Sequence, residues 1–177
     1  MRISGLICLL LSILSASPGA WAQADGKKVD CRYECINPHS TGEESDLVLA
    51  TLQAIFRSVE QSDFTTFASY LDADACMFDE ETNKLVTGRE SIVNALKEHL
   101  EHAHIAEDQV VHFVIDEPYA HVDKDLAVVT FRARKEFAGK HPLAMESQCS
   151  NVFVRKDGQW KMISYRTRWK KVAHPGS

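Results

Sequence analysis

The stretch "VEQSDFTTFASYLDADACMFDE", from Val59 to Glu80, decides the fold prediction. Ser62 or Asp63 has the side chain of a helix N-cap and opens a short helix. The apolar stripe of this helix consists of Phe64, Phe67, Ala68 and Leu71. A short apolar strand from Cys76 to Glu80 follows, and Asp79 lies within it. A carboxylate at this place, at the expected mouth of a cavity, needs an explanation.

Two more helices and a hairpin flank this stretch. Apolar residues at helical spacing predict a first helix over residues 43–59. The turn at residues 82–84 leads the chain back into a second short strand at Leu85-Val86. Gly88 then opens a third helix that continues to about Leu100.

After the third helix the apolar period changes from that of a helix to two residues. Long strands joined by tight turns are expected at residues 110–122, 126–137, 143–155 and 160–172. This order is typical of the α+β class. We expect three N-terminal helices packed on a strongly curved antiparallel sheet that forms a cone-shaped cavity.

Alternate side chains of a strand point to opposite faces, which sorts the predicted sheet. The apolar set is assigned to the inner face: Val129, Phe131, Ala133, Cys149, Asn151, Phe153, Ile163, Tyr165, Thr167 and Trp169. The charged set is assigned to the outer face and includes Arg132, Arg134, Glu136, Glu146, Arg166 and Arg168. A one-residue bulge would exchange the two faces locally.

The N-terminus has the features of a secretory signal peptide over residues 1–22. Met1-Arg2 precedes an apolar run that is too short for a membrane span, and Ala20-Trp21-Ala22 has the small-residue cleavage pattern. Cys8 lies in the middle of the run, which disfavours a lipoprotein anchor. We therefore expect a secreted or periplasmic protein that has no membrane attachment after cleavage.

The composition indicates one ordinary globular domain. The 177 residues carry a formal net charge of −5, which argues against a nucleic-acid-binding protein. We expect a loop-rich N-terminal arm at residues 23–42, the folded domain at residues 43–172 and a short tail at residues 173–177.

Four cysteines remain after the signal peptide: Cys31, Cys35, Cys76 and Cys149. In an oxidising compartment they predict disulfides, with three pairings open. A disulfide at Cys31 and Cys35 would hold the arm in place. A metal site is the alternative, but no histidine pair accompanies these thiols.

The order of these segments resembles the SnoaL-like branch of the nuclear transport factor two-like superfamily. The matching features are Ser62-Asp63, the strand from Met77 to Asp79, Gly88-Arg89, and Gly158-Gln159-Trp160 in "VFVRKDGQWKMISYR". The resemblance covers about residues 43–172. It is specific for the fold but not for function, because this scaffold carries isomerases, dehydratases, cyclases and non-enzymatic association modules.

The resemblance implies a catalytic candidate, Asp79, at the position of the general base of ketosteroid isomerases. Desolvation in an apolar pocket raises the pKa of such a carboxylate, which suits a base. The oxyanion donors of that chemistry are missing, however. The family's tyrosine falls near Ile55, and its protonated aspartate falls at Ser150-Asn151. A carboxylate that orients a ligand or caps a hairpin is the alternative.

The other expected ligand-binding residues are Phe56, His99, Phe131, Asn151 and Tyr165, together with Asp79. Tyr165 either donates to a ligand or satisfies a buried carbonyl. An amide such as Asn151 on an apolar face needs partners, either within the protein or in the ligand. We expect a small, mainly apolar ligand and no cofactor.

Histidines and arginines offer two further interpretations. His99, His102 and His104 lie near the end of the third helix, where cationic side chains also complement the helix dipole, and we expect no metal. The outer-face arginines form either an anion site or ion pairs with Glu136 and Glu146.

Three functions follow: a small-molecule binding module, an isomerase- or dehydratase-type enzyme that uses Asp79, or a dimerisation module. For assembly, an apolar patch on the convex face predicts a homodimer; its residues are Val128, Val152, Val154, Trp160 and Met162. The alternative is that the N-terminal arm folds over this patch.

Overall fold

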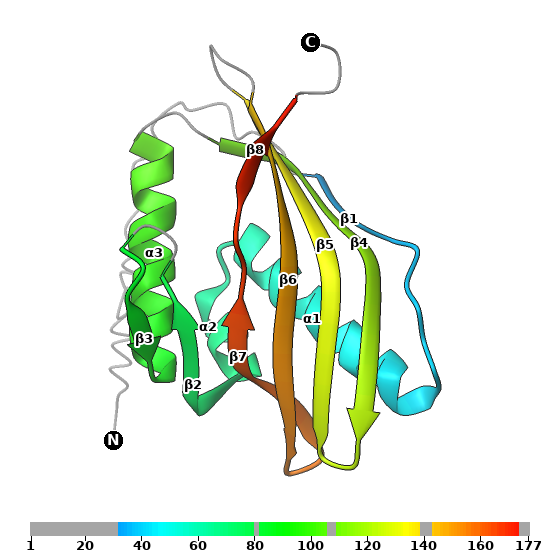
Figure 1. Ribbon diagram of the computed structural model, residues 1–177. Coiled ribbons are helices and arrows are strands. Elements are labelled where there is room, and N and C mark those ends of the chain that lie inside the picture. Colours follow the sequence, from blue (N-terminus) through cyan, green and yellow to red (C-terminus); the bar gives the residue numbers. More distant parts are fainter. Residues whose placement is uncertain (1–31, 80–81, 106–108, 139–142, 174–177) are drawn as a thin grey trace, which may run out of the picture.

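The computed structural model describes residues 32–79, 82–105, 109–138 and 143–173, and the side chains of residues 32, 33, 103–111 and 138 are not described. The predicted signal peptide, Cys31 and the last four residues lie outside this part. Three helices pack on one curled sheet, so the predicted α+β class is confirmed (Figure 1). No helix among the described residues is long and apolar enough to span a membrane.

The first half of the domain contains the helices. α1 spans Glu43–Glu60, α2 spans Phe64–Tyr70 and α3 spans Arg89–Ile105. Asp63 is the N-cap of α2, as expected, and its carboxylate accepts a hydrogen bond from the Thr66 amide at 3.0 Å. Hydrogen bonding from Thr66 lowers the pKa of Asp63.

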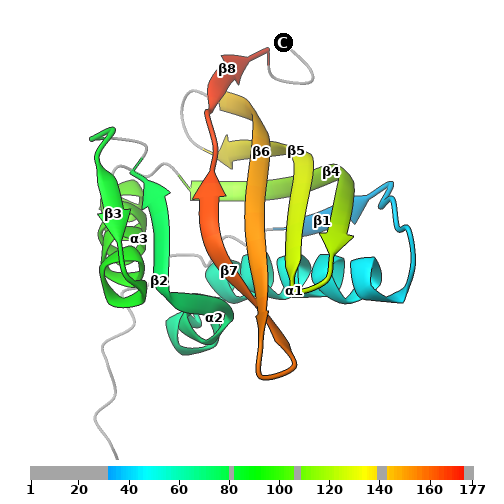
Figure 2. The ribbon, with the colours of Figure 1, turned by 60° about the horizontal axis from the view of Figure 1, so that its bottom comes forward.

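The second half forms the long strands. The bounds of the strands are β1 Arg32–Ile36, β2 Leu71–Phe78, β3 Leu85–Thr87, β4 Gln109–Asp123, β5 Leu126–Ala138, β6 Leu143–Lys156, β7 Gln159–Arg166 and β8 Lys170–Val172. The sheet order is β1-β4-β5-β6-β7-β2-β3, and β8 pairs with β6. The concave side of this sheet faces α1 (Figure 2).

Two features of the sheet differ from the expectation. The sheet is mixed and not antiparallel throughout, because β1 runs parallel to β4 and β2 runs parallel to β7. Residues 32–36 of the predicted loop-rich arm form β1, an edge strand of the same sheet. The sequence missed both features because strand pairing is a long-range property that local patterns do not encode.

The junction between β2, β3 and α3 is built on Gly88 and Arg89. Gly88 has a φ of 88°, and its amide donates to the Ala75 carbonyl oxygen at 2.8 Å. Arg89 Nε donates to the Leu71 carbonyl oxygen at 3.0 Å. This Gly-Arg pair therefore ties the start of α3 to β2, on which the helix packs.

The core lies between the concave face and the helices. Val129, Phe131, Ala133, Cys149, Asn151 and Phe153 are all buried, as the face assignment predicted. The assignment is wrong for Trp160 and Met162, which are each 5% exposed and belong to the core. The β6–β7 register shifts between Val152 and Phe153, which leaves Ile163 as the extra residue and reverses the faces at the start of β7. The predicted convex patch therefore loses both residues.

Candidate functional site

Asn151 is the polar group at the centre of the concave face. It has no exposed surface and pairs with Val129 on β5 and Tyr165 on β7. Its Nδ2 donates to the Met162 sulfur at 3.4 Å, and its Oδ1 has no partner among the described residues. A buried amide oxygen without a donor costs about 1–3 kcal/mol. This acceptor is the strongest sign of a binding role on the concave face.

Aromatic side chains continue this face toward residues 167–169. Phe56 of α1 lies 5.1 Å from Phe113 of β4 and 5.8 Å from Phe131 of β5, measured between ring centroids. Phe113 in turn lies 6.0 Å from Trp169. Phe56, Phe113, Tyr165 and Trp169 are only partly buried. A row of partly accessible rings leads away from the buried Phe131 and Asn151.

A cation also lies on this row of rings. Lys135 Nζ is 4.2 Å from the centroid of the Trp169 ring. Lys135 is the register partner of Phe113 and shares its face of the sheet. The aromatic row therefore ends in a cation–π contact.

Asp79 is part of the β2–β3 hairpin. Its carboxylate accepts hydrogen bonds from the Thr82 amide and the Thr82 hydroxyl, both at 2.6 Å. Its own amide donates to the Lys84 carbonyl oxygen at 2.9 Å. β2 ends at Phe78, so Asp79 lies just beyond the strand and not within it. This geometry fits the hairpin-capping alternative, and the catalytic role stays a prediction.

The structure brings together some of the predicted site residues. Phe56, Phe131, Asn151 and Tyr165 share the concave face, on α1, β5, β6 and β7. Asp79 and His99 come from the hairpin and from α3, on the far side of β7 from Asn151. His99 is partly exposed and His102 is exposed, while the side chain of His104 lies outside the described residues.

The oxyanion donors expected for an isomerase are only partly present. Ile55, near the position of the family's tyrosine, is buried and has no donor group. Ser150 lines a hollow on the convex face, so only Asn151 of the Ser150-Asn151 pair points into the core. Ile55 therefore cannot supply the second donor of that chemistry.

Asp72 is a buried carboxylate that the sequence analysis missed. It is 5% exposed, and its Oδ2 lies 2.6 Å from Lys156 Nζ. The hydrogen bond from Lys156 lowers the pKa of Asp72 and outweighs the opposing effect of desolvation. The pair joins the start of β2 to the end of β6. Local sequence contains no signal for it, since the two residues are far apart in the chain.

Disulfides were predicted for the cysteines, and a metal site was the alternative interpretation. Among the described residues, no three His, Cys, Asp or Glu side chains come together in a way that could hold a metal ion. Cys35, Cys76 and Cys149 form no disulfide with one another, and Cys31 lies outside the described residues. The predicted disulfide framework is not seen in this part of the chain.

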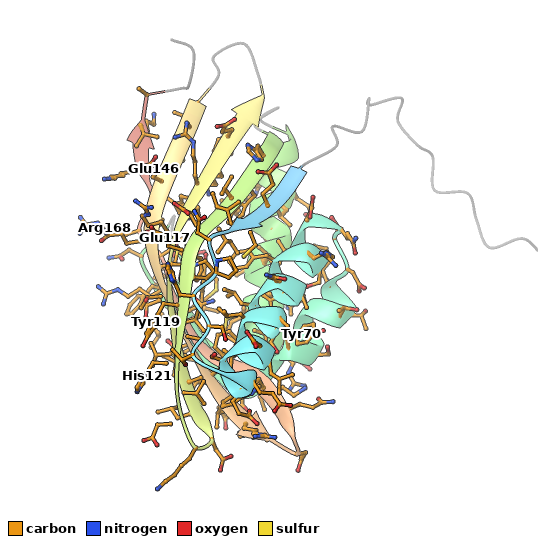
Figure 3. All side chains as sticks on the ribbon, turned by 90° about the vertical axis from the view of Figure 1, so that its right-hand side faces the viewer. Tyr70, Glu117, Tyr119, His121, Glu146 and Arg168 are labelled. Atoms are coloured by element: carbon orange, nitrogen blue, oxygen red, sulfur yellow. The ribbon has the colours of Figure 1, made fainter. Side chains whose placement is uncertain are left out.

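The convex face has a different character from the concave face. A hollow of about 430 Å³ lies there, and three arginines line it: Arg132, Arg166 and Arg168. Figure 3 shows Glu117, Tyr119, His121, Glu146 and Arg168 on the side of the sheet that faces away from the helices. The two faces thus separate an apolar, aromatic surface from a charged one.

The family-model comparison matches a SnoaL-like domain over residues 48–167. The chain therefore belongs to the SnoaL-like domain family, and the resemblance expected from the sequence is confirmed. No curated protein sequence matches this chain.

Solved structures with the same NTF2-like fold include association domains and a candidate enzyme. The CaMKII association domain of C. elegans is 20% identical, with a TM-score of 0.58, and the match covers 70% of this chain and 94% of that one. A candidate dehydratase of the NTF2-like family from Streptomyces avermitilis is 20% identical, with a TM-score of 0.57 and coverage of 69% and 92%. An NTF2-like protein from Cytophaga hutchinsonii is 16% identical, with a TM-score of 0.57 and coverage of 71% and 98%. At these identities the likeness shows the fold alone.

Proposed function

We propose that this protein is an exported member of its family that binds a small, mainly apolar molecule on the concave face of the sheet. The observation that carries the proposal is Asn151, a fully buried amide whose Oδ1 lacks a donor. A ligand hydroxyl or amide group would supply that donor, and the aromatic row from Phe131 to Trp169 would contact its apolar part. The export part of the proposal rests on the signal-peptide pattern of residues 1–22.

The test is native mass spectrometry of the protein purified from its own cells. We expect an adduct of a few hundred daltons that is released on denaturation, because small-molecule ligands of proteins are commonly of that size. Asn151→Leu should lose the adduct, since leucine keeps the number and branching of the heavy atoms but removes the acceptor. Met162→Leu is the matched control, because it removes the sulfur contact of Asn151 and leaves Oδ1 in place. Equal retention of the adduct by Asn151→Leu and the unsubstituted chain would reject the proposal.

Self-association is a second candidate function. It is favoured by the relatives that are association domains and by apolar side chains on the convex face. Tyr119 and Leu126 are 42% and 48% exposed, and Val128, Val152 and Val154 are partly exposed beside them. This group, the convex apolar patch, replaces the earlier patch that contained Trp160 and Met162. Dimerisation through it would bury apolar surface that is otherwise in water.

A further inference from the structure

An interruption of the sheet creates the hollow on the convex face. The β6–β7 ladder ends at the Ser150–Arg166 pair, and pairing with β6 resumes only at Glu146 and Lys170, in β8. Residues 167–169 between these pairs belong to no strand. The Arg168 amide donates to the Ser147 hydroxyl at 2.8 Å inside this gap. The hollow of about 430 Å³ lies at the interruption, so it is built by backbone geometry and not by side chains alone.

The register places polar side chains of three strands around this hollow. Thr130, Ser150 and Arg166 form one row across β5, β6 and β7. Arg132 lies two residues from Thr130 on the same face of β5, and Arg168 lies two residues beyond Arg166. The polar lining therefore combines guanidinium groups with hydroxyl groups and the Gln148 amide, which are donors that oxyanions need, and it contains one carboxylate, that of Glu117.

The four arginines of the outer face do not share one electrostatic environment. Arg132 pairs with Asp116 at 2.7 Å and with Glu117 at 2.9 Å. Arg134 pairs with Glu136 and Glu146, both at 3.2 Å. Arg166 and Arg168, by contrast, make no ion pair within the described part of the chain, and both are exposed. The two sequence interpretations, ion pairs and an anion site, therefore apply to different arginines.

Glu117 lines this hollow, and its backbone constrains its position. It has a φ of 50° at the register shift of β4, next to the buried Pro118. A side chain other than glycine in this backbone conformation is uncommon. Together with Asp116, it holds the Arg132 guanidinium in place. The positive charge of Arg166 and Arg168 remains available in a protein whose formal net charge is −5.

We propose that this hollow binds a small organic oxyanion, a carboxylate or a phosphate monoester, through Arg166 and Arg168. The planar guanidinium fork matches both groups and donates two parallel hydrogen bonds to them. Thr130 and Ser150, which line the same hollow, would contact hydroxyl groups on the same ligand. This site lies on the opposite face of the sheet from Asn151, so it does not depend on the proposed apolar ligand.

The test is a calorimetric titration of the full chain at low ionic strength with citrate and, separately, with inorganic phosphate. We expect saturable binding of at least one probe at one site per chain. The two probes distinguish a carboxylate ligand from a phosphate ligand. Arg166→Gln and Arg168→Gln should each weaken binding about tenfold, the usual effect of losing a charge-assisted hydrogen bond. Lys84→Gln, which removes one positive charge from the β2–β3 hairpin, is the matched control and should bind as the unsubstituted chain does.

Three results would overturn the proposal. The first is no saturable binding of either probe by the unsubstituted chain. The second is an equal loss of binding in Lys84→Gln, which would indicate a general electrostatic attraction and not a site. The third is a change of sedimenting mass in Arg166→Gln or Arg168→Gln with unchanged binding, which would assign these arginines to a contact with a second copy. Melting curves of both variants should match the unsubstituted chain, since both side chains are exposed.

Discussion

The sequence position of Asn151 left two interpretations open, an internal hydrogen bond or a contact with a ligand. An amide on an apolar face needs partners, and the protein supplies only the Met162 sulfur to Nδ2. Its Oδ1 remains without a donor among the described residues. A polar atom that is retained at such a cost within a core is more easily explained by function than by stability.

We expect Asn151→Leu to raise the free energy of unfolding of the ligand-free protein by about 1–2 kcal/mol. The substitution removes an unsatisfied buried acceptor and replaces the amide with an apolar group of the same branching. Urea unfolding of the ligand-free form measures the change. A loss of stability would mean that Oδ1 has a structural partner, such as a buried water, and would weaken the binding proposal. Met162→Leu should change stability by less than 1.5 kcal/mol, since it is a volume-conserving exchange.

The contribution of Asp72 to the stability of the fold depends on pH. Its pKa is lowered in the folded state, mainly by the hydrogen bond from Lys156. Its stabilising effect is therefore present above the ordinary value of 3.8 and is lost as the pH falls through the lower folded-state pKa. Because Lys156 is 52% exposed, solvent screens the pair and limits its contribution to about 1 kcal/mol.

Asp72→Asn should accordingly lower the melting temperature by a few degrees at pH 7. The difference from the unsubstituted chain should begin to shrink as the pH falls below about 4, and it should vanish only once Asp72 is protonated in the folded state as well. Thermal melts across this range check the prediction. Asp74→Asn, an exposed neighbour that contributes only its amide to Asp72, should show no such difference. A pH-independent effect of Asp72→Asn would contradict the ion-pair explanation.

At the scale of elements, the start of α3 depends on one backbone conformation. Gly88 has a φ of 88°, its amide bonds to Ala75, and its carbonyl oxygen accepts from the Ile92 amide. A methyl group there would approach no atom closer than the Ala73 oxygen at 3.9 Å. Any cost of substitution therefore comes from the backbone and not from a clash.

Gly88→Ala should destabilise the protein by about 1–2 kcal/mol, the cost of a left-handed conformation for an L-residue. Urea unfolding compared with Thr87→Ala, an exposed neighbour in β3, isolates the backbone effect. A loss below about 0.5 kcal/mol, the usual effect of a surface substitution, would mean that the junction relaxes to another conformation.

The bulge at Ile163 is the element that changes which side chains of β7 face the core. It turns Trp160 and Met162 into the core and leaves Tyr165 beside Asn151. Trp160→Glu is therefore expected to unfold the domain and would report nothing about assembly. Removing residues 23–42 would also delete the edge strand β1. Neither change is a clean test of whether the molecule forms dimers.

For the whole molecule, Val152→Glu is the sharper test of self-association. Val152 lies opposite Val128 and Ser164 on the convex face, within the convex apolar patch. A buried charge at a two-fold interface would face its own copy, so we expect a dimer to dissociate. Sedimentation of the full chain measures the mass. Leu47→Glu, at a residue of α1 that is 48% exposed, is the matched control. A Val152→Glu protein with the mass of the unsubstituted dimer would contradict self-association through the convex apolar patch.

The two faces of the sheet therefore carry separate hypotheses. The concave face presents one unsatisfied acceptor and a row of aromatic rings, and the convex face presents an apolar patch beside an arginine-lined hollow. In Figure 3, Arg168 and Glu117 lie above Tyr119 and His121 on the convex face. The two features adjoin, because Tyr119 of the patch is the register partner of Thr130, which lines the hollow.

The sequence by itself determined the class, the order of the elements and most of the inner face. Helical and strand periods reflect burial of a stripe or a face, so Phe131, Asn151 and Phe153 were placed correctly from local pattern alone. Asp63 was recognised as a cap for the same reason, because the hydrogen bond it makes is local.

Only the tertiary structure decided that β1 pairs in parallel with β4 and that β2 pairs in parallel with β7. It also decided the bulge at Ile163 and the partners of Asp79, Asp72 and the arginines. A single extra residue in β7 reverses two side chains, and no local pattern announces it. Whether an arginine is paired depends on which carboxylates the neighbouring strands bring within about 4 Å. These are contacts between residues that are far apart in the sequence, and they form only when the chain folds.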